Sequence, residues 1–177
     1  MTWGRLLELD RRWSQALRVA EKPGPLHVVA AILAHSGDSW FWGLGLAGLW
    51  LIDPAGTAEP LGDWRAWSLR ISLGILGLAV LVLPIKYFVR RRRPEGEWGA
   101  IYRTADPHSF PSGHAARAAL LLTLITAWGP AWLRPALWLW APAMSLARVG
   151  LGLHYLSDLA GGLVLGVVAG IAWLILA

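Results

Sequence analysis

Residues 159–177 form an uninterrupted run without a single charged side chain. A helix rises 1.5 Å per residue, so this run reaches about 28 Å, close to the roughly 30 Å of hydrocarbon in a bilayer. A second apolar run, residues 67–89, carries Arg70 and Lys86 near its ends, where long basic side chains can reach the polar surface of a membrane. Because backbone in hydrocarbon has to satisfy its own hydrogen bonds, both runs predict membrane-spanning helices.

Four shorter apolar runs indicate a bundle of helices rather than a simple anchor. They comprise residues 26–34, 39–52, 113–128 and 133–147. The first is too short to cross hydrocarbon alone, so we expect five crossings and one re-entrant or tilted segment. The chain is 56% hydrophobic, its mean hydropathy is +0.49, and its 13 tryptophans favour membrane interfaces. These features predict one all-α polytopic membrane domain over residues 1–177, with about five to six transmembrane helices.

Residues 1–22 differ from the rest because apolar and charged side chains are interleaved there. The apolar positions recur at helical spacing and are Trp3, Leu6, Leu7, Trp13 and Leu17. The charged side chains lie largely off that face, so we expect an amphipathic helix on the membrane surface. No cysteine occurs, which excludes disulfides and thiol chemistry. The net charge of +5 is modest, and the expected partners are the bilayer and its lipids, with no nucleic acid.

A polar cluster lies between the last two apolar runs and contains Arg148, His154 and Asp158. Gly150 and Gly152 can form a turn among them. A helix that starts at or just after His154 would place His154 and Asp158 on one face. A carboxylate on one imidazole nitrogen orients the ring and leaves the other nitrogen free as a nucleophile or base. The alternative is an ordinary polar cap between two helices.

A basic cluster ends the run of residues 67–89. Lys86, Arg90 and Arg93 are spaced by four and three residues, so on a helix they would form one cationic ridge. Arginine presents a planar fork suited to phosphate oxygens and lysine a compact charge, so we expect Lys86 and Arg93 to bind an anion. The alternative is a cluster that only sets membrane topology, and we assign Arg91 and Arg92 to it.

The tetrapeptide Pro111-Ser112-Gly113-His114 opens the next apolar run. Ser112 is a suitable N-cap, and the helix that it begins would direct free backbone N–H groups at an anion. Gly113 would allow close approach, and His114 would project from the first turn. If each of the last four runs crosses the membrane once, this tetrapeptide and the two clusters lie on one side. That coincidence favours a joint phosphate site over a plain capped helix.

Together the three stretches resemble the type 2 phosphatidic acid phosphatase superfamily of membrane lipid phosphatases. The first motif, K-x6-R-P, is matched by Lys86, Arg93 and Pro94, and the second, P-S-G-H, by residues 111–114. The third, S-R-x5-H-x3-D, is matched by Arg148, His154 and Asp158. Ala147 stands where the family usually has serine, so one hydroxyl that contacts phosphate is missing. The motifs together cover residues 86–158.

The resemblance implies that His154 attacks phosphorus to form a phosphohistidine, that Asp158 orients His154, and that His114 protonates the leaving oxygen. The groups that would hold the phosphoryl oxygens are Lys86, Arg93, Ser112, Gly113 and Arg148. It implies a metal-independent enzyme without a cofactor. The expected substrate is a lipid phosphomonoester or a polyprenyl diphosphate, such as undecaprenyl diphosphate, phosphatidylglycerophosphate or phosphatidic acid.

Other functions remain open for the same residues. A lipid phosphotransferase would use the same phosphohistidine with another acceptor, a vanadate-dependent haloperoxidase would use a similar anion site, and an anion channel or transporter would need only a basic vestibule. A zinc site built from His114, His154 and Asp158 is disfavoured, because the neighbouring arginines and lysine would repel a cation.

The remaining histidines have weaker assignments. His27 is expected to be structural or interfacial, whereas His35 and Asp38 are expected on the active side, beside the site or the substrate. The loop before the second motif is expected to line the entrance through Tyr102, Asp106 and His108.

Sidedness has two conflicting indications. Positive-inside counting would place the basic cluster in the cytoplasm, but charges with a catalytic use are poor indicators of topology. Many bacterial members of the superfamily face the periplasm. We therefore expect a bacterial inner-membrane protein whose active site faces the periplasm.

Overall fold

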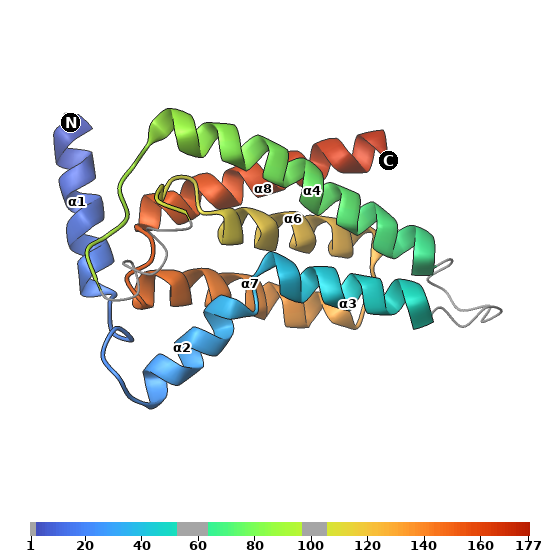
Figure 1. Cartoon of the computed structure of the whole chain (residues 1–177), viewed down its shortest axis with the longest axis horizontal. Coiled ribbons are helices and arrows are strands. Elements are labelled where there is room, and N and C mark those ends of the chain that lie inside the picture. Colours follow the sequence, from blue (N-terminus) through green and yellow to red (C-terminus); the bar gives the residue numbers. More distant parts are fainter. Residues whose placement is uncertain (1–2, 53–63, 97–105) are drawn as a thin grey trace.

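The computed structural model describes residues 3–52, 64–96 and 106–177, and this part of the chain is a bundle of helices (Figure 1). The helices are α1 (Trp3–Ala16), α2 (Pro25–His35), α3 (Ser39–Ile52), α4 (Trp64–Val89), α6 (Gly113–Trp128), α7 (Leu133–Gly150) and α8 (Leu156–Leu176). The predicted all-α membrane bundle is confirmed.

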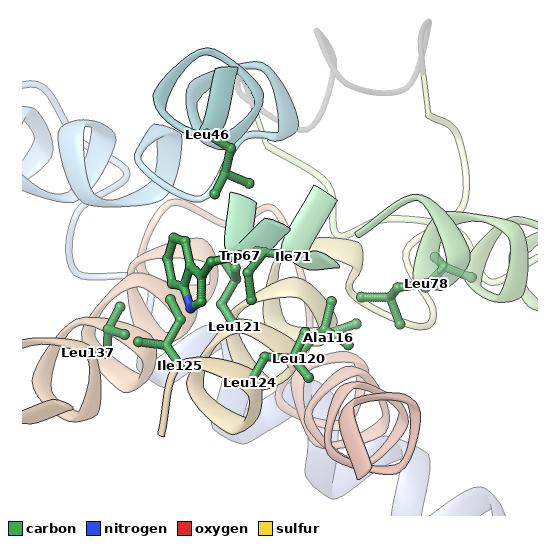
Figure 2. Close-up of a cluster of buried hydrophobic side chains, with 11 residues drawn as sticks. Leu46, Trp67, Ile71, Leu78, Ala116, Leu120, Leu121, Leu124, Ile125 and Leu137 are labelled. Atoms are coloured by element: carbon green, nitrogen blue, oxygen red, sulfur yellow. The ribbon is translucent and has the colours of Figure 1, made fainter. Parts of the chain in front are cut away.

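Helix α6 forms the centre of the bundle, where it packs against α4, α7 and α8. Its buried leucines and isoleucine meet Ile71 and Leu78 of α4 in the main apolar core (Figure 2). Against α8 the contact is closer, because α8 presents Gly162, Gly166 and Gly170 at intervals of four residues. A Cβ atom on Gly166 would overlap the backbone carbonyl of Ala116. Small residues on both helices therefore set the short distance between α6 and α8.

The outer surface of the bundle is apolar, as a protein surrounded by lipid requires. Leu139, Val80 and Ile175 are each at least 70% exposed. Within the described residues, α4 and α8 are long and apolar enough to cross a membrane, while α2 and α3 are apolar but shorter. The count of five to six crossings stays a prediction.

The helix ends that carry the three motifs meet at one end of the bundle. This was predicted from successive helices that cross the membrane in opposite directions. These are the end of α4, the start of α6, the end of α7 and the start of α8, and α1 lies across the same end (Figure 1). Direct contacts join them: Ser112 N donates to the Asp158 carbonyl at 2.9 Å, and Arg93 donates to the Leu153 carbonyl at 2.9 Å.

The predicted helical ridge of Lys86, Arg90 and Arg93 is wrong. Helix α4 ends at Val89, and Arg90 takes a left-handed backbone conformation with φ of 50°. The chain then runs in extended form, and Arg92 pairs with His108 in an antiparallel bridge. This reversal turns Arg93 back beside the P-S-G-H segment instead of continuing the helix.

Candidate active site

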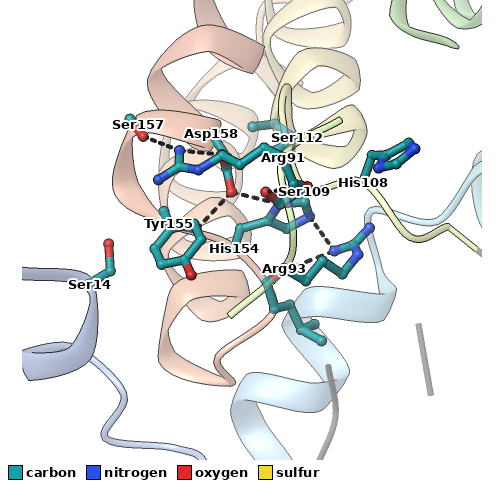
Figure 3. A network of polar contacts seen from close by, with 12 residues as sticks. Ser14, Arg91, Arg93, His108, Ser109, Ser112, His154, Tyr155, Ser157 and Asp158 are labelled. Carbon is teal, nitrogen blue, oxygen red and sulfur yellow. Dashed lines mark hydrogen bonds and ion pairs between the residues drawn. The ribbon is translucent and has the colours of Figure 1, made fainter. Parts of the chain in front are cut away.

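The extended segment after α4 aligns the first and second motifs. Ser109 N donates to the Arg91 carbonyl at 2.8 Å, and the Ser109 hydroxyl lies 3.3 Å from the Arg91 and Arg92 carbonyl oxygens. This pairing satisfies backbone groups that would otherwise be buried without partners. It also places Arg93 directly against the loop that carries His154 (Figure 3).

His154 is 1% exposed and lies between Arg93 and Asp158 (Figure 3). Arg93 Nη1 is 3.1 Å from His154 Nε2. A guanidinium can only donate, so Nε2 carries a lone pair and a neutral ring has its proton on Nδ1. Nδ1 lies 3.5 Å from Asp158 Oδ2, slightly beyond hydrogen-bond length. The nitrogen that a nucleophile needs is therefore the one directed at the basic cluster.

The His154 and Asp158 pair is close for a different reason from the one predicted. Helix α8 begins at Leu156, so His154 precedes the helix and does not share a helical face with Asp158. Asp158 instead reaches back across the helix N-terminus, where its Oδ2 accepts the Tyr155 N–H at 2.9 Å. Gly152, with φ of 71°, makes the turn that returns the chain from α7, as the sequence predicted.

Arg91 is a residue that sequence reasoning assigned to topology alone, and this assignment is wrong. Its Nη1 donates to Asp158 Oδ1 at 2.7 Å, and its Nη2 donates to Asp10 Oδ2 at 2.6 Å. Asp10 also accepts the Ser157 N–H at 3.0 Å, and Ser14 accepts the Leu156 N–H at 2.9 Å. Helix α1 thus caps the N-terminus of α8. The signal in the sequence was Asp10 and Ser14, four residues apart among the polar positions of α1.

Lys86 and Arg93 converge on one carboxylate, that of Asp106. Lys86 Nζ lies 2.7 and 3.0 Å from its two oxygens, and Arg93 Nη2 lies 2.7 Å from Oδ2. Both cations are buried, at 4% exposure each. Asp106 was predicted to line the entrance, but its carboxylate instead occupies the anion position between the two predicted phosphate ligands. This placement shows that the two cations can bind one anion together.

The second motif forms the helix start that the sequence predicted. Ser112 is the N-cap of α6 and accepts the Ala115 N–H at 3.4 Å, and a Cβ atom on Gly113 would meet only Val82, at 3.8 Å. His114 Nε2 is 2.6 Å from Asp38 Oδ1, and Asp38 Oδ2 is 2.9 Å from His35 Nδ1. The expected place of His35 and Asp38 beside the site is confirmed. The short corner between α2 and α3 therefore orients His114.

Arg148 is fully buried at the end of α7. Its charge is one of those that lower the pKa of His154. The neighbouring Ala147 packs among Ala20, Ala30 and Leu151 in a small apolar cluster. The methyl group at position 147 thus contributes to helix packing in this chain.

The charges around the site set the ionisation of its groups. Burial, followed by the charges of Arg93, Arg148 and Lys86, lowers the pKa of His154 well below its ordinary value of 6.5. Burial alone would raise the pKa of Asp106, but the hydrogen bond and charge of Lys86 outweigh it and lower that pKa. Burial would also raise the pKa of Asp38, but the hydrogen bonds with His114 and His35 outweigh burial and lower that pKa. At neutral pH the ring of His154 is neutral and both carboxyl groups are ionised.

The rings of two other predicted histidines make contacts outside the catalytic cluster. His108 supplies its backbone carbonyl to Lys86 at 2.8 Å, and its ring packs edge-on against Tyr87. His27 is turned to the Ala20 carbonyl at 2.8 Å, as expected of a structural histidine. Tyr102 lies outside the described residues.

Known proteins resemble this chain in sequence and in fold. The family model of the PAP2 superfamily matches residues 65–177 of the sequence. Decaprenylphosphoryl-5-phosphoribose phosphatase of Mycobacterium tuberculosis is 35% identical over 156 residues, which cover 86% of this chain and 80% of that protein. The probable lipid phosphate phosphatase beta of Arabidopsis thaliana is 28% identical over 194 residues, which cover 93% and 87% of the two chains.

Two crystal structures share the fold. One is LpxE of Aquifex aeolicus, with a TM-score of 0.67 at 23% identity over 91% of this chain and 93% of that chain. The other is the PAP2-type phosphatidylglycerolphosphate phosphatase of Bacillus subtilis, with a TM-score of 0.73 at 21% identity over 97% and 86%.

Proposed function

The chain belongs to the PAP2 superfamily and is an integral membrane phosphatase. We propose that it hydrolyses a lipid phosphomonoester or a polyprenyl diphosphate through a phosphohistidine intermediate. The observation that carries this proposal is the environment of His154. Its Nε2 lone pair is directed at Arg93, which together with Lys86 holds an anion. A phosphoryl group in the place of the Asp106 carboxylate would lie next to the nucleophilic nitrogen.

The first step forms a bond between His154 Nε2 and phosphorus and breaks the bond from phosphorus to the leaving oxygen. Lys86, Arg93, Arg148, the Ser112 hydroxyl and the backbone N–H of Gly113 hold the phosphoryl oxygens and stabilise their charge. Asp158 stabilises the positive ring that results. His114, whose Nε2 lies 2.6 Å from Asp38 Oδ1, gives its proton to the leaving oxygen.

The second step restores the enzyme. Water attacks phosphorus, His114 accepts the proton from that water, and the bond to His154 Nε2 breaks to release inorganic phosphate. All groups in both steps are side chains or backbone of the protein, so we propose that the reaction needs no metal ion. Transfer to an acceptor other than water would share the first step.

The substrate is a lipid whose phosphate lies at the membrane surface and whose tail stays in the bilayer. Undecaprenyl diphosphate, phosphatidylglycerophosphate and phosphatidic acid fit this description. The name of the mycobacterial relative adds a polyprenyl-linked sugar phosphate to these candidates. We further propose that the site faces the periplasm from the inner membrane of a bacterium.

The test is phosphate release by detergent-purified protein in excess EDTA, from undecaprenyl diphosphate and from a short-chain phosphatidic acid. Release should persist in EDTA and fall by at least about 10³-fold in His154→Ala, since the nucleophile is lost. Brief reaction with ³²P-labelled substrate should label the wild type with a phosphoramidate that is labile in acid and stable in base. His154→Ala should not be labelled.

His27→Ala is the matched control, because the ring of His27 hydrogen-bonds the Ala20 carbonyl and His27 is not a predicted site residue. It should retain activity and labelling. Loss of release in EDTA, or equal release by the wild type and His154→Ala, would refute the metal-free phosphohistidine. A labelled enzyme that releases no phosphate would indicate a transferase.

A further inference from the structure

A cavity of about 1080 Å³ lies beside the catalytic cluster, between α1 and the extended segment that follows α4. Its volume is slightly above the roughly 300–1,000 Å³ of typical small-molecule sites, so a small organic ligand would fit. The catalytic residues His154, His114 and Asp158 do not line it. Asp106 is not among the described residues that line it either, so the cavity lies beside the anion position between Lys86 and Arg93.

The charge of this cavity is strongly positive. Among the residues that the structure describes, its walls carry five arginines and one glutamate: Arg11, Arg18, Arg90, Arg92, Arg93 and Glu95. Arg18 is partly neutralised, because it donates to the Glu95 carbonyl at 2.6 Å and lies 3.6 Å from Glu21. Among the residues that the structure describes, no carboxylate pairs with Arg11 or Arg92. Exposed guanidinium groups around one hollow favour an anionic ligand with several oxygens.

Arg93 connects this cavity to the catalytic site. It lines the cavity, and its Nη1 is 3.1 Å from His154 Nε2. Tyr155, the residue after the nucleophile, lines the same wall. A ligand that reached both places would be attacked at one phosphoryl group while a second anionic group rested against Arg11 and Arg92, with Arg93 between them.

We propose that the cavity is a subsite for a second phosphoryl group of the substrate. The inference rests on the proposed phosphatase function and narrows its substrate. The preferred lipid carries a terminal phosphomonoester, which is released, and a phosphodiester that joins the head group to the tail. A lipid with one phosphate, such as phosphatidic acid, would leave the cavity unused.

The test compares two lipids with the same short acyl chains, phosphatidylglycerophosphate and phosphatidic acid, in a neutral detergent. Arg11→Gln and Arg92→Gln should each raise the KM for phosphatidylglycerophosphate by about 10-fold, the effect of losing a charged hydrogen bond. Their kcat should stay within about twofold, because neither residue contacts the reacting phosphate. The kcat/KM for phosphatidic acid should also stay within about twofold.

Arg12→Gln is the matched control, since it removes the same charge from the next position of α1. Arg12 pairs with Glu8 and does not line the cavity. It should leave both lipids unaffected. If Arg11→Gln and Arg92→Gln weaken both lipids equally, the cavity only attracts anions and the subsite is refuted, while the phosphatase function stands. If the wild type releases phosphate from neither lipid, the proposed function fails and the subsite fails with it.

The cavity could instead bind the phosphate of an anionic lipid in the surrounding membrane, which has the same chemistry as a second substrate phosphate. Adding phosphatidylglycerol to the detergent separates the two sources. If the cavity holds a bilayer phosphate, the defects of Arg11→Gln and Arg92→Gln will appear with phosphatidic acid once phosphatidylglycerol is present. That result would overturn the substrate subsite. Defects that stay confined to phosphatidylglycerophosphate under both conditions would support it.

Discussion

The neutral ring of His154 sets the acid side of the activity profile. The nucleophile is the deprotonated form, and its pKa is lowered below 6.5 by burial and by three nearby cations. We therefore predict that kcat/KM is maintained as the pH falls through 6.5 and declines only below it. The alkaline side should decline as His114 loses its proton, so the profile is bell-shaped.

The measurement is kcat/KM with phosphatidic acid from about pH 4 to about pH 9. His27→Ala should reproduce the wild-type profile. An acid limb centred above pH 6.5 would contradict the lowered pKa of His154, and a flat profile would contradict the pairing of the two histidines.

Asp106 holds the two cations that the substrate phosphate has to reach. Its carboxylate and a phosphate compete for Lys86 and Arg93. We predict that Asp106→Asn strengthens inhibition by inorganic phosphate by about 10-fold, since removing the carboxylate charge frees both cations. Glu95→Gln is the control, because it removes a nearby exposed carboxylate that contacts neither cation. Unchanged or weaker inhibition in Asp106→Asn would show that Asp106 organises the cations rather than competing with the substrate.

Helix α1 acts on the catalytic carboxylate through Arg91. Arg91 joins Asp10 of α1 to Asp158 of α8, with contacts of 2.6 and 2.7 Å. We predict that Arg91→Gln lowers kcat by about 10- to 100-fold, the usual effect of removing a group that orients a catalytic side chain. Asp10→Asn should lower kcat by a smaller factor, since Arg91 keeps its contact with Asp158.

Glu8→Gln on the same helix is the matched control, because Glu8 pairs with the exposed Arg12. It should keep wild-type kcat. An effect of Arg91→Gln on KM alone would indicate that Arg91 serves substrate attraction and does not position Asp158.

The close contact of α6 with α8 depends on Gly166. A Cβ atom there would overlap the Ala116 carbonyl, so the helices would have to separate. We predict that Gly166→Ala destabilises the protein by about 1–3 kcal/mol, the usual cost of overpacking. The measurement is the thermal unfolding midpoint in detergent. Gly77→Ala on α4 is the control, because open space surrounds that position, and it should not lower the midpoint. Equal effects of the two substitutions would contradict the packing account.

The whole molecule has two ends, and the site lies at the one that α1 covers (Figure 1). The chain has no cysteine, so single cysteines report sidedness directly. We predict that Gln15→Cys on α1 reacts with a membrane-impermeant maleimide added to spheroplasts. Trp132→Cys, at the opposite end between α6 and α7, should react only after the membrane is broken. The reverse pattern would place the active site in the cytoplasm.

The sequence by itself determined the elements and the three motifs, because both are local properties. Apolar runs and the N-cap at Ser112 predicted most helix bounds within a few residues, and the motif residues meet at one end because crossings alternate. The sequence did not predict what fixes the chain just outside two of these helices, where the ridge expected beyond Val89 and the helical face expected to include His154 do not form. Helix α4 ends at Val89 because the following segment pairs with His108, and α8 begins after His154 because Asp10 and Ser14 of α1 cap it.

Only the tertiary structure determined which charged side chains contact one another. Arg91 and Asp10 lie 81 residues apart in the sequence, and no local spacing predicts their contact. The same holds for Asp106 between Lys86 and Arg93, and for the arginines that α1 and the segment after α4 bring around one cavity. The physical reason is that a motif specifies which groups are present, whereas the packing of helices sets the distances that determine how strongly charged groups act on one another.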